Sequence, residues 1–344
     1  MKKVLLLADE ASSHTQKWAD AVKANGFDVR VFSIRSSDKS DLQKASYIQH
    51  LSRLKRTISD YKPDLMHAHY ATSYGLLAVL SGFKPYLISV WGSDIFDFPK
   101  RSFFHRQILK YNLRNSKCVV SSSNVMAQEV RKYFSGPIEI IPFGIDLAVF
   151  TRVATRKKML TIGIIKSMED YYGIEELIRA FKIVRENNSD TELKLLLIGG
   201  GTKIEKYKQI VSDLGLNEFV EFRGKISQDL VPAAHNEIDI FVNPSVHESF
   251  GVSVLEASAC ENPVVVTNVG GLKEVVVNNS TGLIVEQGNQ NELIKAISYF
   301  VENREQIDIF GKRGRKFVSG NYDQSNVRHK IKDLYTSFLK SGKQ

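Results

Sequence analysis

The sequence predicts an α/β protein of two domains, each built on a parallel β-sheet. Its 344 residues exceed the roughly 250–300 at which a single hydrophobic core stops growing. Short apolar runs alternate with helix-length segments in both halves, which is the pattern of parallel strands joined by helices. No segment has the ~20 consecutive apolar residues that a membrane-spanning helix needs.

The first half contains six predicted strands and begins with the run VLLLAD at residues 4–9. The acidic pair Asp9 and Glu10 ends this run, so we interpret it as a buried strand and not as a signal peptide. A helix is predicted over residues 14–25 and ends at Gly26. The remaining strands are expected at residues 29–34, 65–70, 86–91, 118–123 and 138–143. We place the first domain at residues 1–147.

The second half repeats this alternation. Strands are expected at residues 158–165, 192–200, 219–224, 238–245, 262–269 and 282–287. Residues 142–158 contain no clear element and are the predicted linker, and the pattern beyond about residue 288 is helical. The second domain is therefore placed at residues 148–344.

Charge and cysteine content limit the partners and the compartment. Residues 1–147 carry 21 basic and 13 acidic residues, whereas the rest of the chain carries 26 and 25. An anionic partner or surface is therefore expected at the first domain. Cys118 and Cys260 lie far apart in apolar runs, which favours buried free thiols and a cytoplasmic protein.

The stretch HESFGVSVLE follows a predicted strand and places Glu248 and Glu256 eight positions apart. Gly251 allows close approach of a ligand to the backbone, and Val252 is expected to begin a helix whose free N–H groups form an anion site. If helical geometry holds throughout, the two acids lie ~80° apart around the axis and both line one cleft. Taken alone, the pair favours a capping acid and a surface glutamate, and only the surrounding residues argue against that interpretation.

The surrounding residues NPSVHESFGVSVLEASACENPVVVTNVGGLKEVV resemble the signature of family 4 glycosyltransferases, which are retaining enzymes of the GT-B type. The resemblance extends over nearly the whole chain and is most specific over residues 193–297. It implies two Rossmann-like domains that face each other across a cleft. The first domain would bind the acceptor and the second a nucleotide-diphosphate sugar. The last helix, residues 324–341, would cross back to the first domain.

The same resemblance implies roles for the residues of this stretch. Glu256 would accept hydrogen bonds from the ribose hydroxyls of the donor, and Glu248 would lie beside the transferred sugar. The sugar and the diphosphate would be held by Phe250, Gly251, Ser253 and Val254.

A cation for the diphosphate is expected in the loop after the first strand of the second domain. Where the family shows G-R-L-x-x-x-K-G, this chain has a longer loop from Gly163 to Gly173, with Ile164 and Tyr172 at the two cationic positions. Lys166 is the candidate that remains, and a solvated lysine is the alternative. Arg223 and Lys225 are second candidates, or they flank the nucleotide base.

In the first domain, Ser13 and His14 precede a helix and offer a hydroxyl and a ring to an acceptor; helix capping is the alternative for His14. Trp91 stands where relatives carry a histidine, and Asp94 is a candidate acceptor ligand. His67 and His69 are read as pointing to opposite faces of a strand, with His69 in the cleft or in a structural role.

No D-x-D pair or spaced ligand set is present, so we expect neither a metal nor another cofactor. Residues 98–117 have six Lys or Arg residues and no acid, with Arg106, Lys110, Arg114 and Lys117 on one helical face. Phe103, Phe104 and Leu113 would form its apolar side, and an anionic membrane surface is the expected partner. A solvated face is the alternative, and nucleic acid is disfavoured because no binding module accompanies the charge.

Together these features predict a retaining transferase of hexosyl or N-acetylhexosaminyl groups. The acceptor would be a glycan or a polyprenyl-linked glycan in the assembly of a cell-surface polysaccharide such as lipopolysaccharide. Two rivals remain: a sugar-nucleotide epimerase of the same fold, and a non-catalytic subunit that binds sugar nucleotides.

Overall fold

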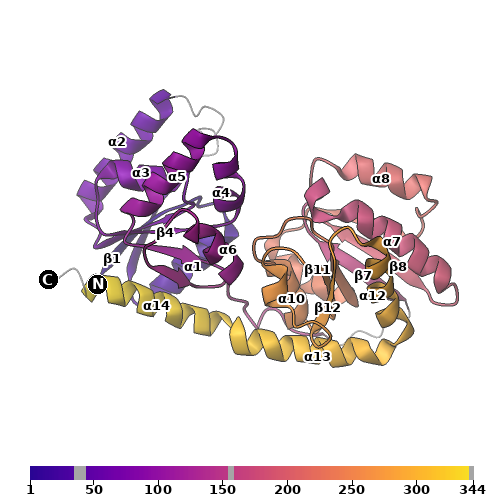
Figure 1. Ribbon diagram of the computed structural model, residues 1–344. Coiled ribbons are helices and arrows are strands. Elements are labelled where there is room, and N and C mark those ends of the chain that lie inside the picture. Colours follow the sequence, from indigo (N-terminus) through magenta and orange to yellow (C-terminus); the bar gives the residue numbers. More distant parts are fainter. Residues whose placement is uncertain (35–43, 154–158, 341–344) are drawn as a thin grey trace. The chain divides into compact units, whose positions relative to one another are not determined.

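The computed structural model describes residues 1–34, 44–153 and 159–340 (Figure 1). The chain divides into two compact units. Unit 1 comprises Met1–Phe143 with Ser325–Gln344, and unit 2 comprises Gly144–Gln324. Each unit is a six-stranded parallel sheet with helices on both faces, so the predicted α/β class with two Rossmann-like domains is confirmed.

Unit 1 has the strand order β2-β1-β3-β4-β5-β6. Its strands are β1 Lys3–Leu7, β2 Asp28–Phe32, β3 Leu65–His69, β4 Tyr86–Ser89, β5 Cys118–Ser121 and β6 Ile138–Ile140. Its helices are α1 Ser13–Ala24, α2 Lys44–Tyr61, α3 Ser73–Ser81, α4 Ser93–Phe96, the 3-10 turn η2 Phe98–Lys100, α5 Phe103–Asn115 and α6 Asn124–Arg131. All six strands lie within the predicted ranges or begin one residue before them.

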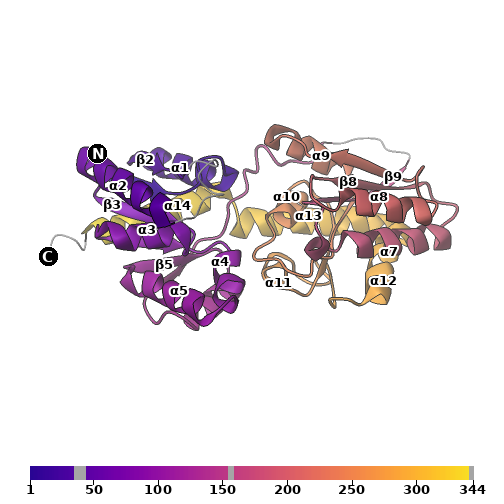
Figure 2. The ribbon, with the colours of Figure 1, turned by 90° about the horizontal axis from the view of Figure 1, so that it is seen from above.

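Unit 2 has the strand order β12-β11-β10-β7-β8-β9. Its strands are β7 Leu160–Ile165, β8 Leu193–Ile198, β9 Val220–Gly224, β10 Ile240–Asn243, β11 Val264–Thr267 and β12 Gly282–Val285. Its helical segments are η3 Asp170–Tyr172, α7 Ile174–Asn187, α8 Ile204–Asp213, η4 Gln228–Leu230, α9 Val231–Glu237, α10 Val252–Ala259, α11 Leu272–Val275, α12 Gln290–Glu302 and α13 Arg304–Asn321. Helix α7 packs against α8 and α12, and α10 packs against α9 and α13, on the two faces of the sheet (Figure 2).

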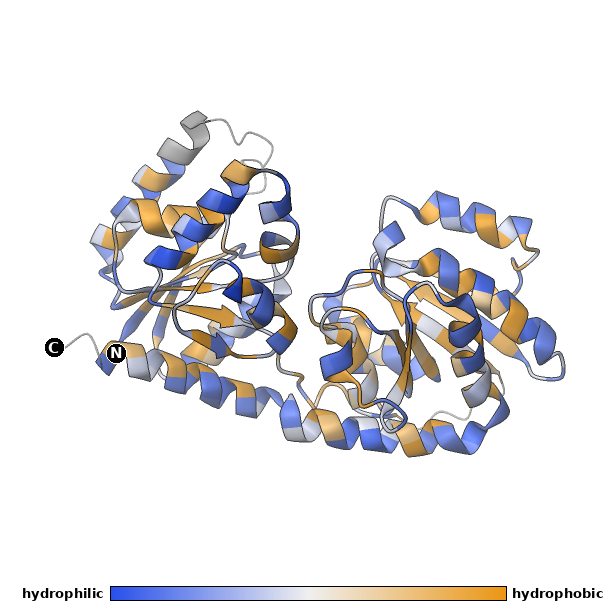
Figure 3. Cartoon of the chain, viewed as in Figure 1, coloured by the Kyte–Doolittle hydropathy of each residue, from blue (hydrophilic) through white to orange (hydrophobic). Residues whose placement is uncertain are grey.

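The strands of both sheets are largely apolar, whereas the helices are mixed (Figure 3). This follows from the parallel arrangement, because helices cover both faces of each strand. In unit 1, alternate strand residues contribute to two cores. Leu5 and Leu7 pack under α2, α3, α5 and α6, and Val4 and Leu6 pack under α1 and α14.

Helix α14, Gln324–Lys340, belongs to unit 1 from Ser325 onward although it follows unit 2 in the sequence. It contributes Val327, Ile331, Leu334 and Tyr335 to the core on the α1 face of the sheet. The predicted linker contains only an isolated bridge in its described part, between Ile145 and Asp323. Its residues 154–158 lie outside the described residues. No described helix combines the length and the apolarity that spanning a bilayer requires.

A buried hydrogen-bond chain ties α14 to the first sheet. The Nε1 of Trp18 donates to the hydroxyl of Tyr335 at 2.8 Å, and that hydroxyl lies 2.7 Å from Nδ1 of His67. Burial holds the pKa of His67 well below its usual range. The ring is therefore neutral, so one nitrogen donates and the other accepts, and Nε2 lies 2.9 Å from the hydroxyl of Ser89.

We expect Tyr335→Phe to lower the free energy of unfolding by about 1–3 kcal/mol, because Trp18 and His67 would each lose a buried partner. Urea titration followed by tryptophan fluorescence would measure the loss. Tyr111→Phe makes the same change at a half-exposed tyrosine of α5, and should shift stability by no more than about 0.5 kcal/mol. Equal losses in the two variants would show that the hydrogen bonds of Tyr335 do not contribute to stability.

Candidate functional site

The strand order of unit 2 reverses direction at a defined place. From β7 the chain proceeds to β8 and β9 on one side of the sheet, then returns to β10 on the other side. Ligands of such sheets bind outside the carboxyl ends of the two strands where the direction reverses. These are β7 and β10, and the loops that follow them carry Lys166 and Glu248.

The structure brings Lys166 and Glu248 into direct contact. The Nζ of Lys166 donates to Oε2 of Glu248, and the two side chains are 15% and 10% exposed. The same Nζ lies 4.7 Å from the ring centroid of Tyr172, which stands at a position where the family shows a cation. Burial, and then the charge of Glu248, raises the pKa of Tyr172, so its hydroxyl stays protonated. A lysine, a carboxylate and a phenol therefore share one partly desolvated spot.

Two glycine turns support the loops of this pair. A Cβ at Gly199 would overlap the carbonyl oxygen of Lys166, and one at Gly270 would overlap the carbonyl oxygen of Glu248. Gly270 has φ +47°, and the N–H of Gly271 donates to the oxygen of Glu248 at 3.0 Å. Backbone thus packs directly on backbone, and a side chain at either position would displace the charged residue.

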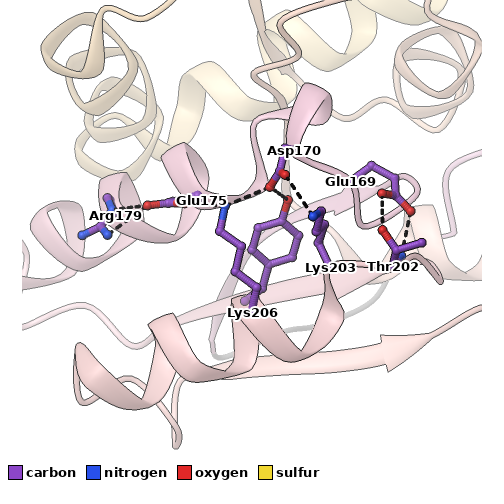
Figure 4. Close-up of polar contacts among 8 residues, drawn as sticks. Glu169, Asp170, Glu175, Arg179, Thr202, Lys203 and Lys206 are labelled. Atoms are coloured by element: carbon purple, nitrogen blue, oxygen red, sulfur yellow. Dashed lines mark hydrogen bonds and ion pairs between the residues drawn. The ribbon is translucent and has the colours of Figure 1, made fainter.

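The outer end of the Lys166 loop is tied to α7 and α8 by polar contacts (Figure 4). The carboxylate of Glu169 accepts from the N–H and the hydroxyl of Thr202, both at 2.7 Å. Asp170 accepts from Lys206 at 2.9 Å, and Lys206 also pairs with Glu175 at 3.0 Å. Exposed pairs contribute little stability one by one, but here they link the loop to two helices.

Helix α10 begins where the sequence predicts it. Gly251 is the residue before its first turn, with φ +104°, and the helix runs from Val252 to Ala259. Glu256 lies one turn inside and is buried. Glu248 precedes Gly251 and is therefore not on the helix, so the ~80° separation expected for a continuous helix does not apply.

The other residues expected around the donor have distinct surroundings. Phe250 and Val254 are buried, and the N–H of Val254 donates to the carbonyl of Gly251 at 3.1 Å. The hydroxyl of Ser253, in the first turn of α10, is buried and has no hydrogen-bond partner within the described part of the chain. Ser253 thus retains an unused donor at the helix start.

Arg223 and Lys225 differ in their surroundings. Arg223 donates to Glu221 at 2.7 and 2.9 Å and to Glu237 at 2.6 Å, which ties the edge strand β9 to α9. Lys225 is exposed and its Cβ lies beside Gly200, next to the turn that supports Lys166. Of the two second candidates, Lys225 is therefore the one whose charge is not engaged by a neighbouring acid in the described structure.

A residue that the sequence did not single out lies behind Glu256. His235, on α9, is fully buried, and its Nε2 is 3.7 Å from Oε2 of Glu256. A lone histidine in the run VPAAHNE carries no spacing signal, so only the folded structure reveals this proximity.

In unit 1 the corresponding reversal of strand direction lies between β1 and β3. His14, in the first turn of α1, packs its ring against Phe143 at 4.4 Å and Trp91 at 5.5 Å between centroids. His69 lies beside Trp91 at 5.3 Å and is buried. The partly exposed rings of His14, Trp91 and Phe143 form an aromatic cluster, and Ser13 is the first residue of the adjoining helix.

The prediction that His67 and His69 point to opposite faces is wrong. Their ring centroids are 4.8 Å apart, because residues i and i+2 of a strand share one face. Burial, followed by the charge of His14, lowers the pKa of His69 to about 3. Neither of its ring nitrogens has a hydrogen-bond partner among the described residues.

Asp94 organises the turn that carries Trp91. Its buried carboxylate accepts from the N–H groups of Ala71 at 2.7 Å, Trp91 at 3.0 Å and Gly92 at 2.9 Å. Burial raises the pKa of Asp94, and these hydrogen bonds oppose the shift. The contacts support a structural use of the carboxylate, with no acceptor contact needed to explain it.

Most of the basic segment, residues 98–117, forms helix α5. Arg106 and Arg114 are exposed, as are the apolar side chains of Phe103, Phe104, Ile108 and Tyr111. Leu113 was expected on the apolar outer side, but it is fully buried in the core of unit 1, since its position faces the sheet together with Leu109. Within residues 1–34, 44–153 and 159–340, no group of three or more His, Cys, Asp or Glu side chains could hold a metal ion.

Comparison with known proteins identifies the family. The family model described as Glycosyl transferases group 1 matches residues 149–317, and that described as Glycosyl transferase 4-like matches residues 3–123. The chain belongs to the group 1 glycosyltransferases of GT-B type. An uncharacterized glycosyltransferase of Methanocaldococcus jannaschii is 28% identical over 76% of this chain and 72% of its own length.

Several other relatives of this glycosyltransferase share shorter segments. A GDP-mannose-dependent phosphatidylinositol monomannoside mannosyltransferase of Mycobacterium tuberculosis is 27% identical, over 57% of this chain and 55% of its own length. The chain thus spans about half the length of several relatives. The solved sucrose-phosphate synthase of Thermosynechococcus elongatus has a TM-score of 0.88 at 20% identity, with 99% of this chain and 100% of that chain covered. At that identity the likeness concerns the fold.

We expect Gly270→Ala to cost more stability than Gly215→Ala. Both glycines have positive φ, which costs an alanine about 1–2 kcal/mol, but a Cβ at Gly215 meets nothing within 4 Å. The additional cost at Gly270 arises because the loop of Glu248 must move. Urea unfolding would measure the difference, and hydrogen exchange at the N–H of Gly271 should accelerate only in the first variant. Equal losses would argue against the close backbone packing.

Proposed function

We propose that this glycosyltransferase moves a hexosyl or N-acetylhexosaminyl group from a nucleotide-diphosphate sugar with retention of configuration. The observation that carries the proposal is the contact between Lys166 and Glu248 at the carboxyl edge of the second sheet, with Glu256 one helical turn inside the adjoining helix. A cation and two carboxylates in this order match the three parts of such a donor: diphosphate, sugar and ribose.

In this proposal, Lys166 and the first N–H groups of α10 bind the diphosphate. Negative charge grows on that group as the bond from the sugar carbon breaks, so fixed donors lower the barrier. The acceptor oxygen forms its bond to the same carbon from the same face, and its proton passes to the leaving phosphate oxygen. Glu248 is paired with Lys166, so we do not assign it the role of the general base that deprotonates the acceptor. In this proposal Glu248 orients the transferred sugar.

The relatives support a nucleotide-sugar donor of this class. The Mycobacterium tuberculosis relative is named as dependent on GDP-mannose, and the Anabaena HepE protein was solved with UDP and glucose, at a TM-score of 0.81 and 17% identity. A capsular polysaccharide biosynthesis glycosyltransferase of Staphylococcus aureus is 32% identical over 52% of this chain and 46% of its own length. These names support a glycan or lipid-linked acceptor in cell-surface polysaccharide assembly.

For the acceptor we propose the aromatic cluster of unit 1. Partly exposed rings of His14, Trp91 and Phe143 suit the apolar faces of a sugar, and Ser13 adds a hydroxyl. His69 supports Trp91 from behind.

A lipid-linked acceptor requires a surface that meets the membrane, and we propose α5 for this role at the cytoplasmic face. With α14 included, unit 1 carries 26 basic and 13 acidic residues, against 21 and 25 in unit 2. Phe104, Ile108 and Tyr111 recur at helical spacing and are exposed on α5, and Arg106 and Arg114 form a second exposed strip of the same helix. An apolar strip next to a basic strip is typical of helices that lie in an anionic membrane interface.

Glu256→Ala should weaken binding of the donor by about 1.5–3 kcal/mol, the value of a hydrogen bond to a charged group, because the ribose hydroxyls lose their acceptor. Glu248→Ala should lower turnover more than donor affinity. A thermal-shift screen of nucleotide sugars would first find the donor, since a ligand at 100 times its dissociation constant adds about 2.7 kcal/mol to stability.

Glu205→Ala, an exposed acid on α8, is the control for both variants. Unchanged donor affinity of a folded Glu256→Ala protein would remove that residue from the site. Isomerisation of the donor sugar without any acceptor would instead favour an epimerase. Turnover should persist in excess chelator, and loss restored by magnesium would reveal a metal requirement.

Replacing Arg106, Lys110 and Arg114 by glutamate should abolish binding to vesicles that contain anionic lipid. Each basic residue near such a surface contributes about 1 kcal/mol, and the reversal makes each contribution repulsive. Cosedimentation with phosphatidylglycerol vesicles at low salt would measure it, with phosphatidylcholine vesicles for comparison. Reversal of Lys312, Arg313 and Lys316, exposed on α13 of unit 2, is the matched control. Wild-type protein that ignores anionic vesicles would contradict membrane docking.

A further inference from the structure

His235 is buried in a way that its packing does not explain. The side chain has no exposed surface, and neither ring nitrogen has a hydrogen-bond partner among the residues that the structure describes. Its ring packs against the aromatic rings of Phe241 and Phe150, with centroids 5.4 and 6.1 Å away. An imidazole whose donor is buried and unpaired costs stability that a phenylalanine in the same apolar pocket would not.

The carboxylate of Glu256 lies close to this ring. Oε2 of Glu256 lies 3.7 Å from Nε2 of His235, which is about 0.7 Å longer than a normal N–H···O bond. The carboxylate sits on α10 and the ring on α9, two helices that pack against each other. A small rotation of either side chain would therefore complete a hydrogen bond.

The helix that carries Glu256 is itself held firmly. Arg315 donates to the carbonyl of Ala259 at the last turn of α10 and to the carbonyls of Phe150 and Leu147. Asn262 donates to the carbonyl of His235 at 2.7 Å, which ties the end of α10 to α9. With both backbones held, the distance between Glu256 and His235 changes only by rotation of their side chains.

We infer that His235 is a positioning residue for Glu256: its Nε2–H donates to Oε2 and turns the carboxylate so that it accepts the ribose hydroxyls of the donor. This inference rests on the proposed donor site. Each carboxylate oxygen accepts two hydrogen bonds, so one bond from His235 leaves capacity for both hydroxyls. Because the hydrogen bond from His235 already restricts the rotamers of Glu256, less side-chain entropy is lost when the donor binds.

The test compares nucleotides with and without the hydroxyls. Dissociation constants of UDP and GDP, each paired with its 2′,3′-dideoxy form, give the preference for the hydroxyls as a ratio. We expect His235→Phe to reduce that ratio about tenfold, toward the value of Glu256→Ala. His50→Phe makes the same change at a buried histidine of unit 1 and should leave the ratio unchanged.

Two amides separate hydrogen bonding from packing. His235→Gln places an N–H near the position of Nε2 and should retain the preference, whereas His235→Asn is one methylene shorter and should lose it. This pair also decides the question if His235→Phe does not fold. Weaker binding of both nucleotide forms with an unchanged ratio would make His235 purely structural and overturn the inference.

The possible failures are distinguishable. If Glu256→Ala loses the preference and His235→Phe keeps it, the inference is wrong and the proposed donor site stands. If the wild-type protein binds a nucleoside diphosphate without any preference for the ribose hydroxyls, the role of Glu256 itself is wrong and the inference falls with it.

Discussion

Two charges that are largely removed from water, on Lys166 and Glu248, impose the strongest constraint on the second unit. Burying an ion pair costs desolvation energy, and removing one partner leaves the other buried without compensation. Such a pair persists only where the surrounding backbone holds both residues in place. The glycine turns at Gly199 and Gly270 provide this by packing main chain on main chain. Tyr172 adds an aromatic face beside the lysine.

The position of this pair follows from sheet topology. In a parallel sheet every strand ends at the same edge, and two loops diverge where the chain reverses direction. Lys166 and Glu248 are 82 residues apart in sequence and meet because β7 and β10 are neighbours in the sheet. The same principle gathers His14 and Trp91 at the carboxyl edge of unit 1. In each unit the candidate site residues therefore lie at the carboxyl ends of the strands, near the place where the strand order reverses direction.

Stability and the proposed chemistry use buried polar groups in different ways. His67 is fully satisfied by Tyr335 and Ser89, and it holds α14 against the first sheet. His69 and His235 have no such partners in the described structure, and each lies beside a residue of a candidate site. Unsatisfied buried groups are uncommon because they cost free energy, so they direct attention to function.

The sequence by itself determined the twelve strands, the two-sheet organisation, the family and the start of α10 at Gly251, because apolar runs, glycines and a long motif are local signals. Lys166 also followed from the sequence, since it is the cation within its loop. Only the tertiary structure decided that Lys166 pairs with Glu248, that Leu113 faces inward, that His67 and His69 share a face, and that His235 lies behind Glu256. The pairings join residues from different strands and helices, and the direction in which a residue faces depends on what packs against it. Neither is encoded in the spacing along one segment.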